Sequence, residues 1–358
     1  MSLTVLSVAY PPAPVGPAAV GGSEQVLTLL DTALVRAGHR SLVIACAGSV
    51  TAGTLIPVPR FEGTLTDFQN AELQARHRAT IAEVVRTQHV DVVHLHGMDF
   101  HAYLPPPGPP ALVTLHLPPA WYAAGALFVD RPRTYLHCVS ASQRQFCPPG
   151  LTLSPDIPNG VPVEALAARH GKRRYLLSLG RICREKGCHC ALDAAVRADF
   201  PLLMAGRVFP YAAHEAYFQD CIVPRLDRWR RFIGPVGFAR KRRLLTAARA
   251  LLVPSLAPET SSLVAMEALA CGTPVIAFRA GALPDIVEHG VTGFLVDGVE
   301  EMAAAIEAAG SINPAACREA ARSRFSIDRM VADYFATYET LAGLARGSTG
   351  PREVSHAA

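Results

Sequence analysis

Lysine is scarce in this chain of 358 residues, occurring only at positions 172, 186 and 241 among 34 lysines and arginines. The 30 acidic residues leave a formal net charge of only +4, so we infer no nucleic-acid partner.

Long apolar runs are missing too. The apolar start of the chain ends at Pro11 and Pro12, is too short to span a bilayer and lacks a basic leader. We therefore interpret it as a first strand, not a signal.

Paired cysteine patterns are also absent. Nine cysteines, an odd number, are scattered along the chain, which favours a reducing cytoplasm over a disulfide framework. The cluster Cys183, Cys188, His189 and Cys190 invites a zinc hypothesis, but its C-x4-C-H-C spacing matches no common structural zinc pattern. We therefore expect no metal site.

Two common nucleotide-binding motifs are missing as well. No G-x-G-x-x-G segment occurs, which argues against a dinucleotide-dependent dehydrogenase. Residues 16–23 approach the phosphate-binding pattern G-x4-G-K-[ST], but Gly22 stands where the lysine is needed. A P-loop without that charge loses its main electrostatic element. Gly21 and Gly22 then form either a flexible loop before a helix or a backbone that approaches a ligand closely.

What the chain does contain is a regular alternation of strand and helix patterns, which predicts parallel α/β layers. We expect a domain over 1–157, a turn-rich linker over 158–173 and a second domain over 174–326, followed by a helix over 327–346 and a disordered tail over 347–358. The predicted strands of the two sets are 3–9, 41–45, 91–95, 111–115 and 135–139, then 175–179, 202–205, 231–233, 250–253, 275–277 and 293–296, with helices at 23–36 and 68–87 in the first set.

Two glutamates flank a predicted helix start after the strand at 250–253. Glu259 lies in the loop at the carboxyl end of that strand, where ligands bind in open α/β sheets. Ser261 or Ser262 could cap the helix that runs to about residue 270, and its first N–H groups suit a pyrophosphate. Glu267 lies roughly one turn further on and leans back towards that end. The alternative is that both glutamates are solvated surface charges.

Other polar residues follow strand ends. Arg181 and Lys186 come after the strand at 175–179 and could converge on the same pyrophosphate, where two fixed cations and a helix N-terminus would stabilise a leaving diphosphate without a divalent metal. His116 ends the strand at 111–115, at the mouth of the first sheet. His94 and His96 end a neighbouring strand and could line the same cleft. A lone histidine is more often structural than catalytic, so these roles stay open here.

The segment 258–277, PETSSLVAMEALACGTPVIA, resembles the donor-binding signature of the retaining glycosyltransferases of family 4 (glycosyl transferases group 1), which have the GT-B fold. The E-x7-E motif of that family matches Glu259 and Glu267. The resemblance implies that Glu259 contacts the donor sugar, that Glu267 contacts the ribose, and that the backbone of Ser262, Leu263 and Val264 contacts the pyrophosphate. This chain departs from the family at residues 260–262, Thr-Ser-Ser, where an aromatic residue and a glycine are usual.

Further segments carry the same resemblance. Residues 180–186 resemble the family's G-R-x4-K motif, which implies that Arg181 and Lys186 bind the diphosphate. Gly21 and Gly22 resemble the loop that approaches the donor or acceptor. The T-x-H pattern at the strand end implies that His116 lies near the donor sugar, although Leu117 replaces the usual aspartate. The implied fold is α/β of GT-B type, with two doubly wound Rossmann-like domains facing across a cleft and the last helix crossing back onto the first domain.

These observations predict a metal-independent, retaining glycosyltransferase with His116 and Glu259 as its catalytic residues. It would move a sugar from a UDP- or GDP-sugar to an unknown acceptor that is a glycan, a lipid-linked molecule or a small molecule, with no cofactor besides the donor. A nucleotide-sugar epimerase of the same fold and a non-catalytic nucleotide-sugar-binding module are the alternatives. The arginines at 225–231 and 240–243 are either exposed helix faces or a contact with anionic lipid. The expected location is therefore cytoplasmic, free or peripheral to the inner membrane face.

Overall fold

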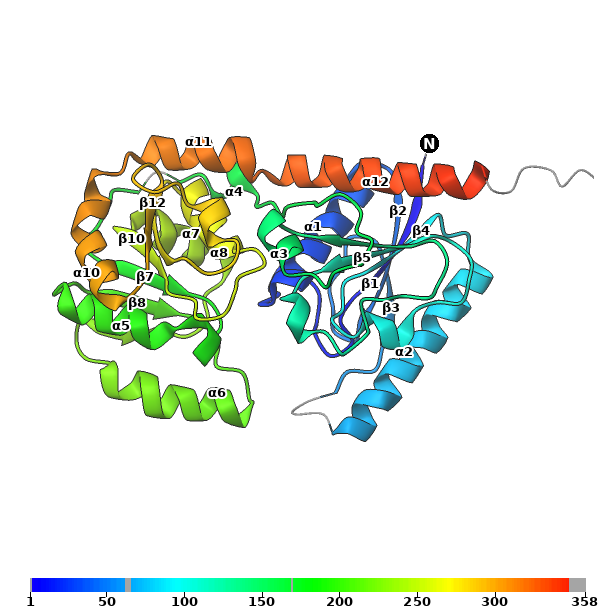
Figure 1. Ribbon diagram of the computed structural model, residues 1–358, viewed down its shortest axis with the longest axis horizontal. Coiled ribbons are helices and arrows are strands. Elements are labelled where there is room, and N and C mark those ends of the chain that lie inside the picture. Colours follow the sequence, from blue (N-terminus) through cyan, green and yellow to red (C-terminus); the bar gives the residue numbers. More distant parts are fainter. Residues whose placement is uncertain (1, 62–65, 169, 348–358) are drawn as a thin grey trace, which may run out of the picture.

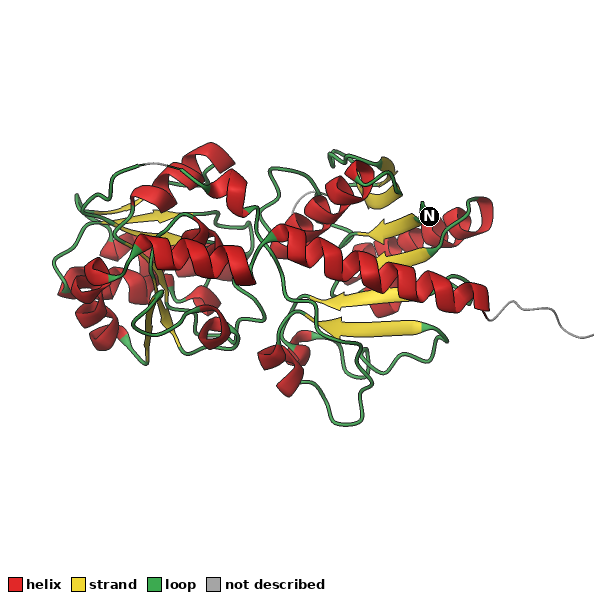
Figure 2. Cartoon of the chain, turned by 90° about the horizontal axis from the view of Figure 1, so that it is seen from above, coloured by secondary structure: helices red, strands yellow, loops and turns green. Residues whose placement is uncertain are grey.

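The computed structural model describes residues 2–61, 66–168 and 170–347. Two parallel six-stranded sheets lie side by side along the molecule, each covered by helices (Figures 1 and 2). Their strand orders are β3-β2-β1-β4-β5-β6 and β12-β11-β10-β7-β8-β9. In each sheet, the first strand in chain order lies beside the fourth. This is the doubly wound order, in which ligands usually bind at the point where the strand order reverses. The predicted α/β fold class is confirmed.

The first sheet and its helices, here the N-terminal lobe, agree closely with the predicted elements. Among its strands only β3 was not predicted, and the short helices η1, η2 and α3 were not predicted either. Strand β3 is a half-exposed edge strand that contains Pro57, and a proline weakens the strand signal at such a position. The elements are β1 (Thr4–Val8), α1 (Gly22–Arg36), β2 (Arg40–Cys46), β3 (Thr54–Val58), α2 (Asp67–Thr87), β4 (Val92–Leu95), η1 (Phe100–Tyr103), β5 (Ala111–Leu115), η2 (Pro119–Trp121), β6 (Thr134–Cys138) and α3 (Ala141–Gln145).

The second sheet and its helices form the C-terminal lobe, and all six of its strands were predicted to within one residue at each end. One interpretation was wrong: in the segment 225–231, residues 226–231 are not helical. Asp227 accepts bonds from the backbone N–H groups of Trp229 and Arg230 and turns the chain into β9. The elements are β7 (Leu176–Leu179), η3 (Arg184–Lys186), α5 (Cys188–Arg197), β8 (Leu202–Ala205), α6 (Ala212–Tyr217), η4 (Phe218–Ile222), η5 (Val223–Arg225), β9 (Arg230–Phe232), α7 (Phe238–Ala247), β10 (Ala250–Val253), α8 (Leu263–Ala270), β11 (Val275–Phe278), α9 (Leu283–Ile286), β12 (Gly293–Val296), α10 (Val299–Ala308), η6 (Ala309–Ser311) and α11 (Pro314–Arg324).

The last helix, α12 (Ile327–Gly347), leaves the C-terminal lobe and lies along the N-terminal lobe (Figure 1). Its Met330, Tyr334 and Tyr338 are buried in one apolar cluster with Val5 and Leu30. Burying such side chains contributes roughly 1.5–3 kcal/mol each, so this helix holds the two lobes together. The described part of the chain contains no helix that is both long and apolar enough to cross a membrane.

The predicted linker 158–173 contains a short helix, α4 (Val163–Leu166), whose Val163 and Leu166 are buried in the core of the C-terminal lobe. The segment is therefore packed rather than free where it is described. The domain limits proposed from the sequence stay predictions, and all of the predicted tail 347–358 except its first residue lies outside the described residues.

Candidate functional site

Helix α8 begins in the loop at the carboxyl end of β10, as predicted, but no serine caps it. Ser262 stands at the N-cap position without a side-chain capping bond. The buried hydroxyl of Ser261 has no hydrogen-bond partner among the described residues. The expectation of a serine cap was wrong. Because no serine side chain caps the helix, the first N–H groups of α8 remain available to a ligand. An uncapped helix N-terminus carries partial positive charge and suits an anion.

Glu259 and Lys186 meet at this helix start. The Lys186 ammonium donates to both carboxylate oxygens of Glu259, at 2.7 and 2.9 Å, and the Ser255 hydroxyl donates to one of them. The Glu259 side chain is 8% exposed and that of Lys186 is 31% exposed. The sequence analysis assigned Glu259 to the donor sugar and Lys186 to the diphosphate. In the structure the two side chains form one ion pair.

Gly187 allows the loops that carry Lys186 and Glu259 to lie close together. Its φ is +60°, and an added Cβ would lie 1.9 Å from the carbonyl oxygen of Pro254. Only glycine adopts this left-handed backbone without strain and also leaves room for the neighbouring chain. The loop after β7 therefore packs directly on the loop after β10, which brings Lys186 to Glu259.

Glu267 forms a second ion pair, with Lys241 of α7. The carboxylate side chain is only 5% exposed and that of Lys241 is 17% exposed. Burial raises the pKa of Glu267, and the Lys241 charge and hydrogen bond oppose that effect. Two of the three lysines thus pair with the two glutamates of the E-x7-E motif.

Helix α1 of the N-terminal lobe begins opposite α8. Gly21 is its N-cap residue, and a Cβ at Gly22 would lie 3.6 Å from the Cδ1 of Leu263. A Cβ at Gly21 would lie 1.9 Å from a carboxylate oxygen of Glu24, so the glycine at position 21 leaves space for that side chain. Burial raises the pKa of Glu24, while the positive charge of Arg181 lowers it. Arg181, Gly21 and the start of α8 therefore lie around one region between the lobes.

His116 follows β5 and also faces the C-terminal lobe. Its carbonyl oxygen accepts a hydrogen bond from the Thr260 hydroxyl at 2.8 Å. Its ring Nε2 lies 3.0 Å from Nδ1 of His96, and the two rings are stacked. Burial lowers the pKa of His116 to about 3, with a smaller contribution from His137. The imidazole is therefore neutral at physiological pH.

The loop that carries His116 is fixed from behind by Gln143. The Gln143 amide donates to the carbonyl oxygens of Leu115 and Leu117, at 2.7 and 2.9 Å. The N–H of Leu117, which stands where the aspartate was expected, donates to the Tyr122 hydroxyl at 3.3 Å. Hydrogen bonds to the backbone thus hold the histidine without an acidic neighbour at position 117.

His94 does not line the same region, contrary to one sequence interpretation. It is fully buried, with Nδ1 at 2.7 Å from the Tyr338 hydroxyl and Nε2 at 2.7 Å from the Thr114 hydroxyl. His96 is also buried and stands behind His116. The histidine cluster is therefore a core network that connects the loop of His116 to α12.

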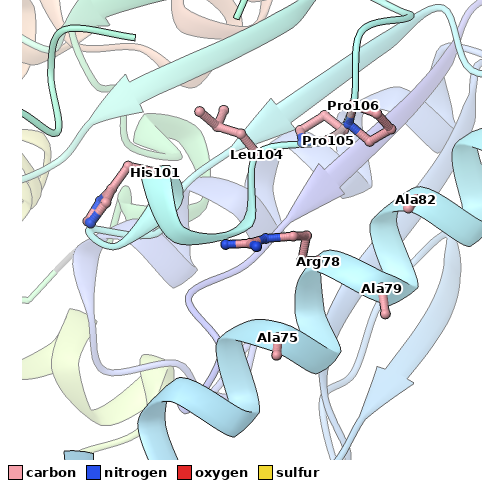
Figure 3. A pocket seen from close by; sticks show the side chains of 8 residues that line it. All are labelled: Ala75, Arg78, Ala79, Ala82, His101, Leu104, Pro105 and Pro106. Carbon is pink, nitrogen blue, oxygen red and sulfur yellow. The ribbon is translucent and has the colours of Figure 1, made fainter. Parts of the chain in front are cut away.

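A separate hollow of about 560 Å³ lies within the N-terminal lobe, between α2 and the segment after η1 (Figure 3). Arg78 extends from α2 towards that segment, and its Nε donates to the carbonyl oxygen of Ala102 at 2.9 Å. None of the predicted site residues lines this hollow. Its walls are formed by Ala75, Arg78, Ala79, Ala82, His101, Leu104, Pro105 and Pro106.

Comparison with known proteins assigns both lobes. The family described as Glycosyltransferase Family 4 matches residues 20–147, and the family described as Glycosyl transferases group 1 matches residues 173–310. The chain belongs to the family 4, group 1 glycosyltransferases. The family predicted from the sequence is confirmed.

Curated relatives of this family 4 chain match over shorter segments. A D-inositol 3-phosphate glycosyltransferase of Mycobacterium sp. (strain KMS) is 46% identical over 92 residues, which are 25% of this chain and 21% of the relative. A protein of the same name from Pseudarthrobacter chlorophenolicus is 50% identical over 137 residues, which are 35% of this chain and 31% of the relative. The matched segments thus span less than a third of the length of these relatives.

Solved structures match the family 4 chain over nearly its whole length. Sucrose-phosphate synthase from Thermosynechococcus elongatus has a TM-score of 0.79 at 19% identity, covering 96% of this chain and 100% of that one. A glycosyltransferase involved in avilamycin A biosynthesis has a TM-score of 0.70 at 23% identity, covering 94% and 98%. An Anabaena protein solved with UDP and glucose has a TM-score of 0.73 at 19% identity, covering 94% and 99%. At these identities the likeness establishes the GT-B fold.

The structure brings most of the predicted site residues to one region. Glu259 and Lys186 are paired, the α8 start faces Gly22, and His116 is tied to residue 260. Sequence reasoning missed Lys241 as the partner of Glu267, although the scarcity of lysine was a signal that each lysine has a specific place.

Proposed function

We propose that this family 4 chain transfers a sugar from a nucleoside diphosphate sugar to an acceptor hydroxyl with retention of configuration. The observation that supports the proposal best is the meeting of the uncapped α8 N-terminus with the ion pair of Lys186 and Glu259. A dipolar helix end and a nearby ammonium suit a diphosphate. The carboxylate beside them suits sugar hydroxyls, which donate hydrogen bonds.

The donor would lie between the lobes. The diphosphate would contact Arg181, Lys186 and the backbone N–H groups at Ser262, Leu263 and Val264. Glu267, held by Lys241, would accept hydrogen bonds from the ribose hydroxyls, and Glu259 would accept them from the sugar. On the other lobe, Gly21 and Gly22 would allow the α1 backbone to approach the same donor, and His116 would face the anomeric carbon.

In the reaction, the bond between the anomeric carbon and the diphosphate oxygen breaks, and its electron pair goes to that oxygen. The acceptor oxygen bonds to the same face of the sugar, and its proton passes to the departing diphosphate. The transition state has oxocarbenium character. Arg181 and Lys186 would stabilise the charge on the leaving group, which is the role of a divalent cation in other enzymes, so we propose that this step needs no added metal.

His116 suits a position near that centre because it is neutral. Burial lowers its pKa to about 3, so at neutral pH it adds no positive charge opposite a developing oxocarbenium ion. Its bond to His96 fixes the ring orientation. We therefore assign His116 to hydrogen bonding and positioning at the donor sugar, without a role as a general acid.

Transfer with purified protein tests the proposal. UDP-glucose is the first donor to try, because an Anabaena structural neighbour was solved with UDP-glucose; other UDP- and GDP-sugars follow. D-inositol 3-phosphate belongs among the acceptors because of the names of the curated relatives, beside glycans, lipid-linked acceptors and small molecules. We expect nucleotide release that depends on the acceptor, a product of unchanged anomeric configuration by NMR, and no acceleration by Mg²⁺ or Mn²⁺.

Two outcomes would reject the transferase assignment. Conversion of the nucleotide sugar without an acceptor would indicate an epimerase, and donor binding without turnover of any acceptor or of water would indicate a binding module. Acceleration by Mg²⁺ of more than about tenfold would reject the metal-free step, since that is roughly what one additional charge-stabilising interaction supplies.

We also propose a cytoplasmic location. All nine cysteines are free, and such thiols persist in a reducing compartment. A peripheral contact with the inner membrane face through the arginines of α7 stays part of this proposal, and sedimentation with anionic vesicles tests it: binding that disappears at high salt is expected.

A further inference from the structure

We propose a zinc site formed by Cys183, Glu185 and His214. One ligand atom from each side chain lies within 4.8 Å of the other two. Cys183 directly precedes η3 and Glu185 lies within η3, whereas His214 belongs to α6. The three residues therefore come from two segments that the fold brings together.

The donor set fits zinc better than other common cations. Thiolate sulfur, imidazole nitrogen and carboxylate oxygen are its usual ligands, whereas Mg²⁺ and Ca²⁺ take oxygen ligands. Bond lengths of about 2.0–2.3 Å in a tetrahedron place ligand atoms roughly 3.3–3.6 Å apart. The separations, which are at most 4.8 Å, must therefore shorten by no more than about 1.5 Å. Side-chain torsions can supply this because Glu185 is exposed and His214 is half-buried. Three protein ligands leave a fourth position for water on the exposed side.

The charges of the group balance those of the ion. Glu185 is an exposed carboxylate, which carries a negative charge at neutral pH. When zinc binds, the Cys183 thiol gives its proton to solvent, and the two anionic ligands neutralise Zn²⁺. A neutral site beside the Arg181 guanidinium avoids repulsion between the two cations.

His214 provides an independent observation. Its Nδ1 atom is buried and has no hydrogen-bond partner among the described residues. The ring is held edge-on by Phe209 and Tyr211, at centroid distances of 6.4 and 5.2 Å. A buried imidazole nitrogen without a partner is costly, and ligation through Nδ1 would satisfy it.

The proposed site differs from the cysteine and histidine cluster that the sequence displays. His189 lies against Tyr217, with Nδ1 at 2.8 Å from its hydroxyl, and Cys190 Sγ lies 3.4 Å from His189 Nε2. Only Cys183 of that cluster joins the proposed site. Zinc there would tie α6 to the segment that carries Arg181 and Lys186 and would stabilise its position.

Zinc binding to the full chain tests the site without donor or acceptor, so the result is independent of the proposed transferase activity. The purified protein is stripped with a chelator, titrated with zinc against a chromophoric chelator, and analysed for metal after gel filtration. Cobalt in place of zinc reports thiolate ligation by its absorption. The variants are Cys183→Ser and His214→Ala, with Cys190→Ser and His189→Ala as matched controls from the neighbouring cluster.

We expect about one zinc per wild-type chain, because the fold already brings three zinc ligands together. Cys183→Ser and His214→Ala should each weaken zinc at least about tenfold and abolish the cobalt–thiolate band, whereas the controls should bind like wild type. Thermal unfolding without metal verifies that each variant is folded. Stoichiometry near zero in the wild type, or unchanged affinity in both site variants, would overturn the proposal.

Discussion

Replacement of Lys241 by methionine isolates the buried partner of Glu267. Methionine keeps most of the apolar stem of lysine and removes the charge. The Glu267 side chain, 5% exposed, would then lose its cationic partner, while its burial would be nearly unchanged. An uncompensated buried carboxylate is among the few changes with a large cost in stability.

The expected cost follows from the exposure of the pair. Removing one partner of a fully buried ion pair costs about 3–5 kcal/mol. Lys241 is 17% exposed, so solvent screens part of the interaction, and we expect about 2–3 kcal/mol. For a unit of the size of one lobe this corresponds to a fall in melting temperature of roughly 4–12 °C.

The pH dependence has a definite sign. Burial raises the pKa of Glu267 in the folded protein, so its contribution to stability is fully present below the unfolded pKa of about 4.3 and is lost as the pH rises through the folded pKa. Removing Lys241 raises that folded pKa further. The difference in stability between wild type and Lys241→Met should therefore be smallest near pH 4 and should increase towards pH 8.

Thermal and urea unfolding from pH 4 to pH 8 measure this difference, and the transition of the C-terminal lobe must be resolved because two lobes need not unfold together. Lys172→Met is the control, since Lys172 donates to the Thr273 hydroxyl and has no carboxylate partner among the described residues. Burial lowers the pKa of Lys172 to about 8, so the two variants are compared from pH 4 to about pH 7, where Lys172 stays charged and its own contribution to stability does not change with pH. A Lys241→Met cost below about 0.5 kcal/mol, within the range of ordinary surface substitutions, or one that shrinks as the pH rises, would show that Lys241 does not compensate a buried charge on Glu267.

Two further predictions concern the region between the lobes. Gly21→Ala should lower the free energy of unfolding by about 1–2 kcal/mol, because its Cβ would meet the buried Glu24 carboxylate at 1.9 Å. The control Gly22→Ala, whose Cβ would lie 3.6 Å from its nearest neighbour, should change the free energy of unfolding by less than about 0.5 kcal/mol. Equal effects of the two substitutions in urea unfolding would contradict this prediction. Glu259→Gln should lower the transfer rate about 10–100-fold. Nucleotide binding, measured by calorimetry, should not weaken, because Lys186 is freed from its ion pair. A loss of nucleotide affinity as large as the loss of rate would show that the Glu259 carboxylate supports the nucleotide site instead.

Local patterns predicted the sheets well because each buried strand is a continuous apolar run between turn residues. The strand β3 escaped because its residues are half-exposed and include Pro57. The segment 225–231 was misinterpreted because its charges suggest a helix face, whereas the geometry depends on the Asp227 side chain bonding to the backbone. Such bonds compete with regular structure and leave little trace in composition.

The sequence predicted which residues belong to the candidate site better than it predicted which side chains they contact. Spacing placed Glu259 and Glu267 around the start of α8, but the pairing of Glu267 with Lys241 depends on how α7 packs against α8. His94 illustrates the same limit, because its partner Tyr338 lies 244 residues away. Contacts across such separations are set by tertiary packing and have no local signal.

Calorimetric titration of the wild-type chain with UDP, GDP and ADP, each compared with its nucleoside, tests most directly whether α8, Arg181 and Lys186 bind a diphosphate. Two charge-assisted contacts at about 1.5 kcal/mol each predict that the preferred nucleoside diphosphate binds at least roughly 100-fold tighter than its nucleoside. Lys186→Met should remove about tenfold of that preference. Equal affinity for nucleoside and nucleoside diphosphate, or a preference that Lys186→Met leaves intact, would show that these groups do not bind the diphosphate.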